Sequence, residues 1–316
     1  MSTPIEACFC NGNIQNFGLA NCLTELGAPS ALVIAQRKTS GDTDNFIDLT
    51  ATLNQATMEG FFFAEDDANR YIIIPQIKAY TPEQAEPVTD EASNGDIDNV
   101  RDGVASMMFE FRSGDIYKAV AKWKGIDCLD LMAFLIDDKG NLLGKLETGD
   151  KFSGLLIAKN SFVILPSPNN FEGVNKYTVK FNLELGSGWD KVDYIAADDF
   201  TDYSLLSQGA LRDVNIVISA VTDTTMDFSL SLDWGSAKTR SIQGVLGLTT
   251  ADLQLRNVTD DSTVVFTTLD EPATPDGTYS AVFASQAGAL VGVDPILNVK
   301  EPLSLNRLNS VNIQIV

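Results

Sequence analysis

The side chains of this chain that could do chemistry are carboxylates and thiols, because the sequence contains no histidine. Histidine is the most common general base, so catalytic arrangements of the Ser-His and Cys-His type are excluded. Carboxylate pairs occur at Asp137-Asp138 and Asp198-Asp199, where we expect a turn and the start of a helix. Turn and capping roles explain such pairs better than acid–base catalysis. We therefore expect no catalytic residues and no enzymatic activity.

The four cysteines give no clear metal or redox signal. Cys8, Cys10 and Cys22 lie near the N-terminus, and Cys128 begins an apolar run. A zinc site without histidine would need all four thiolates, so free thiols are the simpler interpretation. The loop 137–141 lacks the alternating ligands of an EF-hand, and a weak calcium site in the acidic loops is the alternative. Walker and dinucleotide-binding motifs are absent, so we expect no cofactor and no metal.

The chain is strongly acidic, with 43 Asp and Glu against 22 Lys and Arg and a net charge of −21. Such a surface repels the backbone of nucleic acids, so specific nucleic-acid binding is not expected. The charge serves solubility or, alternatively, lines a passage through which DNA moves without sticking. The N-terminus lacks a signal-peptide pattern and no apolar run reaches 18 residues, so we expect no membrane association.

The most prominent local pattern is an apolar hairpin at residues 125–146. A nearly unbroken apolar run from Cys128 to Ile136 predicts a strand buried on both faces, and the loop 137–141 has turn-forming residues. Cover for this hairpin must come from other sheets of the chain or from another subunit. The candidate interface residues are Leu131, Phe134, Ile136, Leu142 and Leu143.

The remaining patterns predict a mainly β protein. Apolar and polar residues alternate strictly at 177–185 and 226–234, which indicates half-buried antiparallel strands. Further strands are expected at 31–36, 71–77, 104–111, 155–165, 214–221, 253–258, 264–268, 278–283 and 311–316, and short helices at 50–63, 115–124 and 203–207. We interpret 1–30 as an N-terminal arm, 31–200 as a β-sandwich or barrel assembly domain, and 201–316 as an Ig-like β-sandwich.

Residues 81–103 form the least globular segment. They are rich in acids and poor in apolar residues, and the acids that we assign to an assembly role are Glu83, Glu86, Asp90, Glu91, Asp96 and Asp98. Loops of this length inside a compact domain are rare and often functional. We interpret the segment as an arm or long hairpin that is mobile in the free subunit and ordered by a neighbouring subunit; a mobile surface loop is the alternative.

The middle of the chain resembles structural proteins from the morphogenesis modules of tailed phages that infect Bacteroidetes. The resemblance covers roughly residues 50–185, in the order LNQATMEGFF, RYIIIPQIKAYTPEQAE, NVRDGVASMMFEF, CLDLMAFLIDDKGNLLG and YTVKFNLEL. It implies a tail-tube-type or other repeating virion subunit, and the C-terminal β-sandwich is similar to the Ig-like modules that such subunits carry. It implies no active site.

The leading hypothesis is a non-enzymatic tail tube subunit that self-assembles into stacked, hexameric rings around a DNA channel. Its partners would be other copies and other virion proteins, and it would reside in the virion tail after assembly in the host cytoplasm. The runner-up is a capsid or head-decoration protein. A remote alternative is a carbohydrate-binding virion module that uses Trp189 or Trp234.

Overall fold

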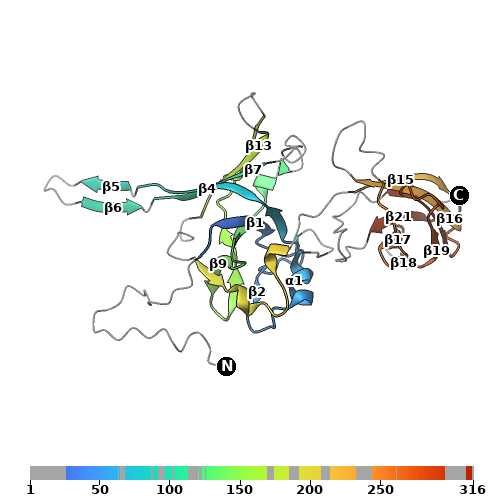
Figure 1. Ribbon diagram of the computed structural model, residues 1–316, viewed down its shortest axis with the longest axis horizontal. Coiled ribbons are helices and arrows are strands. Elements are labelled where there is room, and N and C mark those ends of the chain that lie inside the picture. Colours follow the sequence, from blue (N-terminus) through green and yellow to red (C-terminus); the bar gives the residue numbers. More distant parts are fainter. Residues whose placement is uncertain are drawn as a thin grey trace.

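Antiparallel β-sheet dominates the protein. The computed structural model describes residues 26–62, 64, 68–86, 88–91, 97–101, 103–112, 120, 123–124, 126–168, 174–184, 192–207, 214–232, 244–260, 262–295 and 311–314. Every ladder between its named strands is antiparallel. The buried apolar residues form two clusters within residues 31–205 and a separate one within 214–293. The predicted fold class, a β-sandwich followed by a second, Ig-like sandwich, is confirmed (Figure 1).

The first sandwich is built from two sheets. The larger has the order β2-β10-β9-β8-β1-β3, with β11 on β8 and β14 on β9. Its strands are β1 (Pro29–Gln36), β2 (Ile47–Asp48), β3 (Ile72–Pro75), β8 (Leu131–Asp137), β9 (Leu142–Glu147), β10 (Lys151–Ser153), β11 (Leu155–Leu156) and β14 (Asp193–Ile195). The smaller has the order β12-β13-β7-β4, from β4 (Ile77–Gln84), β7 (Ala105–Arg112), β12 (Val163–Ser167) and β13 (Lys176–Asn182).

Strands β1 and β8 are buried on both faces of the larger sheet. On one face Leu32 and Leu135 pack against Phe109 and Phe181 of the smaller sheet. On the other face a second cluster contains Val33 and Phe134 together with apolar residues of helix α1 (Gln55–Phe62). Burial on both faces explains why the β8 sequence is a continuous apolar run rather than an alternating one.

The predicted hairpin at 125–146 is confirmed as β8, a tight turn and β9. Strand β8 begins at Leu131 rather than at Cys128, because Ile126–Cys128 form a 3-10 turn, η2. Gly140 in the turn adopts a φ of +90°, which glycine tolerates without strain. The apolar pattern thus predicted the hairpin and its turn correctly, but placed the start of the first strand three residues too early.

Helix α1 begins later than expected. Asp48 or Thr50 could have capped a helix that begins near residue 50, but Asp48 accepts hydrogen bonds from the N–H and hydroxyl of Thr50 instead. Asn54 is the observed cap, since its side-chain oxygen accepts a hydrogen bond from the Thr57 N–H at 3.0 Å. Of the predicted helix 115–124, residues 115–119 and 121–122 lie outside the described residues, and the predicted 203–207 segment contains the 3-10 turn η5 (Leu205–Ser207).

The second sandwich has the strand arrangement of an immunoglobulin-like fold. One sheet has the order β15-β16-β20-β19 and the other β18-β17-β21-β22. In chain order these are strands A-B-E-D and C′-C-F-G, as in Ig-type domains. The strands are β15 (Val214–Val221), β16 (Thr225–Leu232), β17 (Leu253–Asn257), β18 (Ser262–Val264), β19 (Phe266–Asp270), β20 (Thr278–Phe283), β21 (Leu290–Pro295) and β22 (Val311–Gln314).

Two strands of this sandwich differ from expectation. The strand predicted at 264–268 is divided between β18 and β19, with Val265 between them at 76% exposure. Strand β21 was not predicted, because Gly292 and Pro295 weaken its strand pattern. Leu205 packs in the same buried cluster as Phe200, so the core of the first sandwich continues past residue 201.

Candidate functional site

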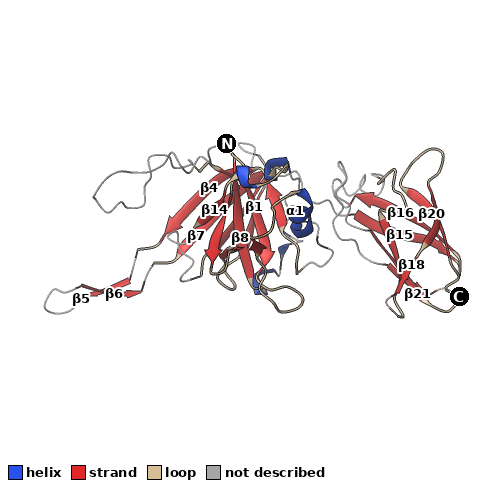
Figure 2. Cartoon of the chain, turned by 90° about the horizontal axis from the view of Figure 1, so that it is seen from below, coloured by secondary structure: helices blue, strands red, loops and turns tan. Residues whose placement is uncertain are grey.

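The feature most suited to a function is a hairpin that extends from the smaller sheet of the first sandwich. Strands β4 and β7 pair along their whole length, from Ile77 opposite Phe111 to Gln84 opposite Ala105. Ala85 N–H then donates to the Val104 carbonyl at 3.0 Å, and β5 (Val88–Glu91) pairs with β6 (Ile97–Arg101). Figures 1 and 2 show β5 and β6 leading away from the sheets. We call residues 81–103 the hairpin arm; its described residues form a paired hairpin, and its contact with a neighbouring subunit stays a prediction.

The base of the hairpin arm is held by backbone contacts rather than by a core. Residues 81–86 are all exposed. The Gln84 side-chain amide donates to the Gly103 carbonyl at 2.6 Å. Gly103 lies so close to the Ala85 carbonyl that any Cβ would collide with it, which explains glycine at this position. The described base of the arm, residues 81–86, therefore buries little surface against its own chain.

The predicted acidic residues lie along this hairpin arm. Glu83 on β4 accepts a 3.4 Å hydrogen bond from Ser106 and lies 3.9 Å from the Lys180 ammonium, and Glu86 is exposed. Asp90 and Asp98 occupy directly opposite register positions of β5 and β6. Like charges in opposite positions destabilise a β-ladder. Of the remaining predicted residues, Glu91 lies on β5 and Asp96 lies outside the described residues.

The prediction that five residues of the β8–β9 hairpin form a subunit interface was wrong, because they lie in the core of the chain. Leu131, Phe134, Ile136 and Leu142 are at most 5% exposed, and Leu143 packs against the core between the two sheets. The chain's own smaller sheet and helix α1 supply the cover that the sequence required. A side chain buried inside its own fold has no surface to offer another subunit, so these residues belong to the core of the first sandwich.

The turn between β8 and β9 contains a buried carboxylate with a structural role. Asp137 is fully buried and accepts hydrogen bonds from Gly27 N–H (2.8 Å), Lys139 N–H (2.9 Å), Asn141 N–H (2.8 Å) and the Asn141 side chain (2.7 Å). Burial alone would raise the pKa of the Asp137 carboxyl, but these hydrogen bonds together lower it. Asn141 in turn accepts from Ala197 N–H at 2.9 Å. The network fixes the turn, as expected for this acidic pair.

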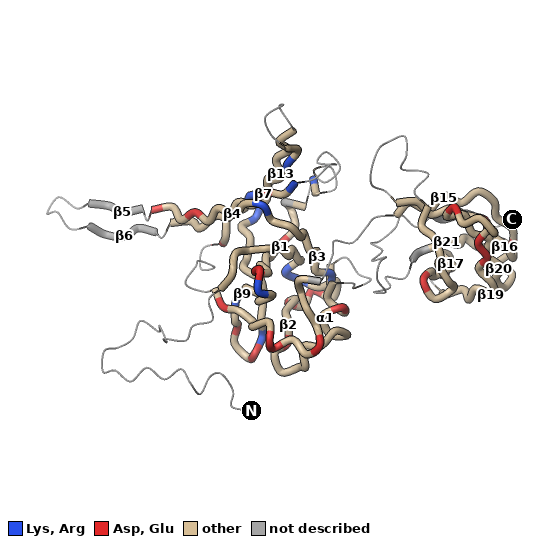
Figure 3. The backbone as a smooth tube through the Cα atoms, in the orientation of Figure 1, with Lys and Arg blue, Asp and Glu red and all other residues tan. Residues whose placement is uncertain are grey.

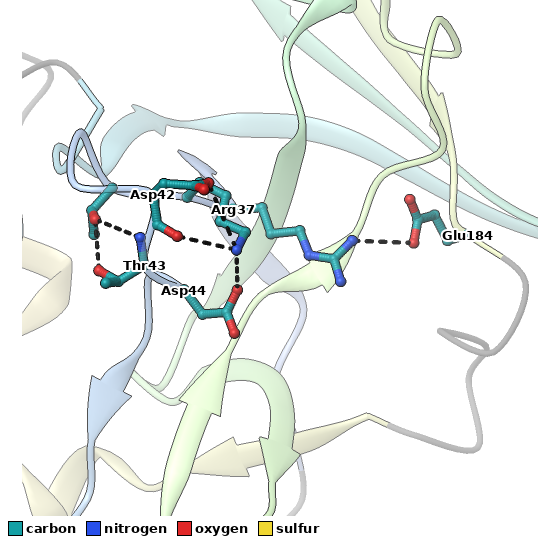
Figure 4. Close-up of polar contacts among 7 residues, drawn as sticks. Arg37, Asp42, Thr43, Asp44 and Glu184 are labelled. Carbon is teal, nitrogen blue, oxygen red and sulfur yellow. Dashed lines mark hydrogen bonds and ion pairs between the residues drawn. The ribbon is translucent and has the colours of Figure 1, made fainter.

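The larger sheet also carries a polar cleft of about 280 Å³ lined by residues that include Arg37, Asp44 and Lys151. Figure 4 shows Arg37 pointing toward Glu184, at 3.9 Å, and Asp42 and Asp44 grouped on its other side. Lys38 lies 3.2 Å from Asp44 and 3.9 Å from Asp42. These side chains are partly exposed, so each pair contributes little to stability. These contacts connect residues of the 37–44 loop to one another and to Glu184.

The other chemistry considered for this chain finds no support in the described part of the structure. No group of three or more Cys, Asp and Glu among the described residues could hold a metal ion. Cys128 is exposed, whereas Cys8, Cys10 and Cys22 lie outside the described ranges. Trp189 and Trp234, the candidates for carbohydrate binding, also lie outside them.

In the second sandwich a shallow hollow of about 320 Å³ is lined by residues that include Asp227, whose carboxylate accepts a 2.7 Å hydrogen bond from Ser280.

Two features of the smaller sheet were not singled out from the sequence. Its edge strand β12 carries two exposed apolar side chains, Val163 at 43% and Leu165 at 53% exposure. At the end of the sheet away from the hairpin arm, Arg112 and Lys176 are direct register partners, and Lys78 lies at a bulge next to the Ile77–Phe111 pair. These cations lie far apart in the sequence, so only the strand pairing reveals them.

None of the helices that the structure describes combines the length and apolar character needed to span a membrane. Comparison of the chain with protein-family models and with curated proteins found no match.

Proposed function

We propose that this protein is a structural subunit of a phage virion that self-assembles into stacked rings, as a tail tube subunit does. The hairpin arm carries this proposal. It extends beyond the sheet that supports it, it is exposed at its base and it is rich in carboxylates. A segment that contributes so little to its own core is well suited to contact a neighbouring subunit, where its ordering entropy can be offset.

Lateral contact within a ring requires a second surface, and the smaller sheet supports one. Strands β12 and β4 are its two edges, and each leaves backbone N–H and C=O groups without a ladder partner on its outer side among the described strands. Val163 and Leu165 add exposed apolar surface to the β12 edge. Proteins usually protect such edges, because an open apolar edge pairs readily with another chain.

The net charge of −21 is consistent with the same proposal. A channel that lets DNA slide must not bind its phosphates, and an acidic protein meets that requirement by electrostatic repulsion. The second sandwich has its own core, so it can be carried on such an assembly without contributing to ring contacts.

Deletion of the hairpin arm tests the proposal. Removing residues 84–99 should leave both sandwiches folded, because their cores contain no residue of this segment. The deletion variant should remain a monomer in sedimentation velocity at concentrations where the full chain assembles. Assembly of the variant with wild-type efficiency would contradict the role of the arm. Antibody labelling of virions then separates tail from head: labelled heads with unlabelled tails would refute the tail assignment.

A further inference from the structure

The two strands that carry the hairpin arm have opposite charges at their two ends. At the far end of β4 and β7 lie Arg112 and Lys78, and Lys176 of β13 is the direct register partner of Arg112. At the near end the chain continues into the acidic hairpin arm. Figure 3 shows Asp and Glu along β4 toward β5, and Lys and Arg close to β7 and β13. We call Lys78, Arg112 and Lys176 the basic end.

The basic end has more positive charge than the described residues of its own chain neutralise. Lys176 pairs with Glu110 at 2.8 Å. Lys78 and Arg112 are both exposed, and neither forms an ion pair with another described residue. Arg112 and Lys176, as direct cross-strand partners, also repel each other. An exposed group of cations on a strongly acidic protein attracts an acidic partner by charge complementarity.

The hairpin arm has the length to reach such a site on another copy. From Gln84 to Glu91 the arm continues for seven residues beyond the β4–β7 ladder, or about 23 Å at about 3.3 Å per residue. The β4–β7 ladder is itself formed by strands of eight residues. An arm of this length therefore spans roughly the distance between the two ends of a neighbouring copy's ladder.

We propose that the acidic hairpin arm of one copy binds the basic end of a second copy in a head-to-tail contact. The inference rests on the proposed self-assembly and names the surface that receives the arm. A contact between two different patches of the same chain repeats along a row of subunits instead of closing on itself in a pair. It thus joins successive rings of a stack, and salt weakens it because the contact is made by exposed charges.

Complementary charge reversal tests this contact. One variant carries Asp90→Lys and Asp98→Lys on the arm, and the other carries Lys78→Glu and Arg112→Glu at the basic end. The arm substitutions change the net charge of strands β5 and β6 from −2 to +2. Each variant alone therefore has charge of the same sign on β5–β6 and at the basic end, whereas a mixture of the two gives each of these patches a partner of opposite sign. A variant with Asp198→Lys and Asp270→Lys, at exposed acids outside both patches, matches the arm variant in charge. Circular dichroism and thermal unfolding of all variants establish that they are folded.

Association is measured by sedimentation velocity for each variant alone and for the equimolar mixture. We expect each charge-reversed variant alone to associate at least about tenfold more weakly than wild type, and the mixture to recover to within about threefold. The control variant should associate as wild type does. The contact would be overturned if either variant alone associated as strongly as wild type. It would also be overturned if the mixture associated no more strongly than each variant does alone.

These outcomes are distinguishable from a failure of the proposed function. Rings or tubes that form equally well from either variant alone would overturn the arm contact and leave the ring-forming role standing. A wild-type chain that forms pairs and short rows through this contact but no rings or tubes would support the contact and refute the proposed function. A wild-type chain and a mixture that are both strictly monomeric would refute both.

Discussion

Replacing Asp137 by asparagine should destabilise the first sandwich more than its small change in size suggests. The carboxylate accepts four hydrogen bonds, two on each oxygen, from Gly27 and from Lys139 and Asn141 in the β8–β9 turn. An amide retains one accepting oxygen and places an NH₂ group against the other two donors. Hydrogen bonds to charged groups contribute about 1.5–3 kcal/mol each, so losing two should lower the free energy of unfolding by about 3–6 kcal/mol.

The neighbouring residue provides a matched control. Asp138 has the same side chain in the same turn but is exposed. Asp138→Asn should change the free energy of unfolding by no more than about 0.5 kcal/mol, as is usual for surface substitutions. Urea unfolding followed by pulsed hydrogen-exchange mass spectrometry reports on the two sandwiches separately. Only the first should lose stability; equal effects of the two substitutions, or a loss below about 1 kcal/mol for Asp137→Asn, would refute the reasoning.

The difference between wild type and Asp137→Asn should also depend on pH in one direction. Hydrogen bonding lowers the pKa of Asp137 in the folded protein below its usual value of 3.8. The charged form therefore stabilises the fold fully above the unfolded-state pKa, and this contribution is lost as the pH falls through the folded-state pKa. We expect a constant difference at neutral pH and a smaller one below about pH 3.8.

Three further predictions concern the second sandwich and the hairpin arm. Tyr279 donates a 2.8 Å hydrogen bond to the buried Val245 carbonyl, so Tyr279→Phe should lower the stability of the second sandwich alone by about 1–2 kcal/mol in the same urea assay. Gly103→Ala should distort the base of the arm by contact with the Ala85 carbonyl, speeding proteolytic cleavage within 81–103 while leaving the melting of both sandwiches unchanged. In the wild type, limited proteolysis of that segment should be fast for free protein and slow in the assembly; equal rates in both states would show that the arm makes no subunit contact.

The alternation of apolar and polar residues predicted several strands, because one face of each packs in the core and the other faces solvent. The alternation at 177–185 gave β13, and the one at 226–234 gave β16. The apolar run of β8 indicated burial on both faces, but not what covers them. The covering residues, such as Phe62 and Phe109, lie far away in the sequence. The hairpin was therefore predicted correctly, but it packs against its own chain rather than against another subunit.

The candidate site was only partly predictable for a similar reason. Composition identified 81–103 as an acidic arm or hairpin, because acids and few apolar residues rule out a core segment. The pairing of β5 with β6 follows from continuation of the β4–β7 ladder, which short segments do not reveal. The basic end depends on the register of three strands, and no local pattern links Lys78, Arg112 and Lys176.

Electron microscopy of the purified full-length chain at high concentration and low salt tests the central claim most directly. We expect rings of uniform diameter that stack into tubes, with the hairpin arm lying between successive rings. Raising the salt concentration should shorten the tubes, because charge contacts between rings are screened. A protein that stays strictly monomeric at every salt and protein concentration would contradict the account.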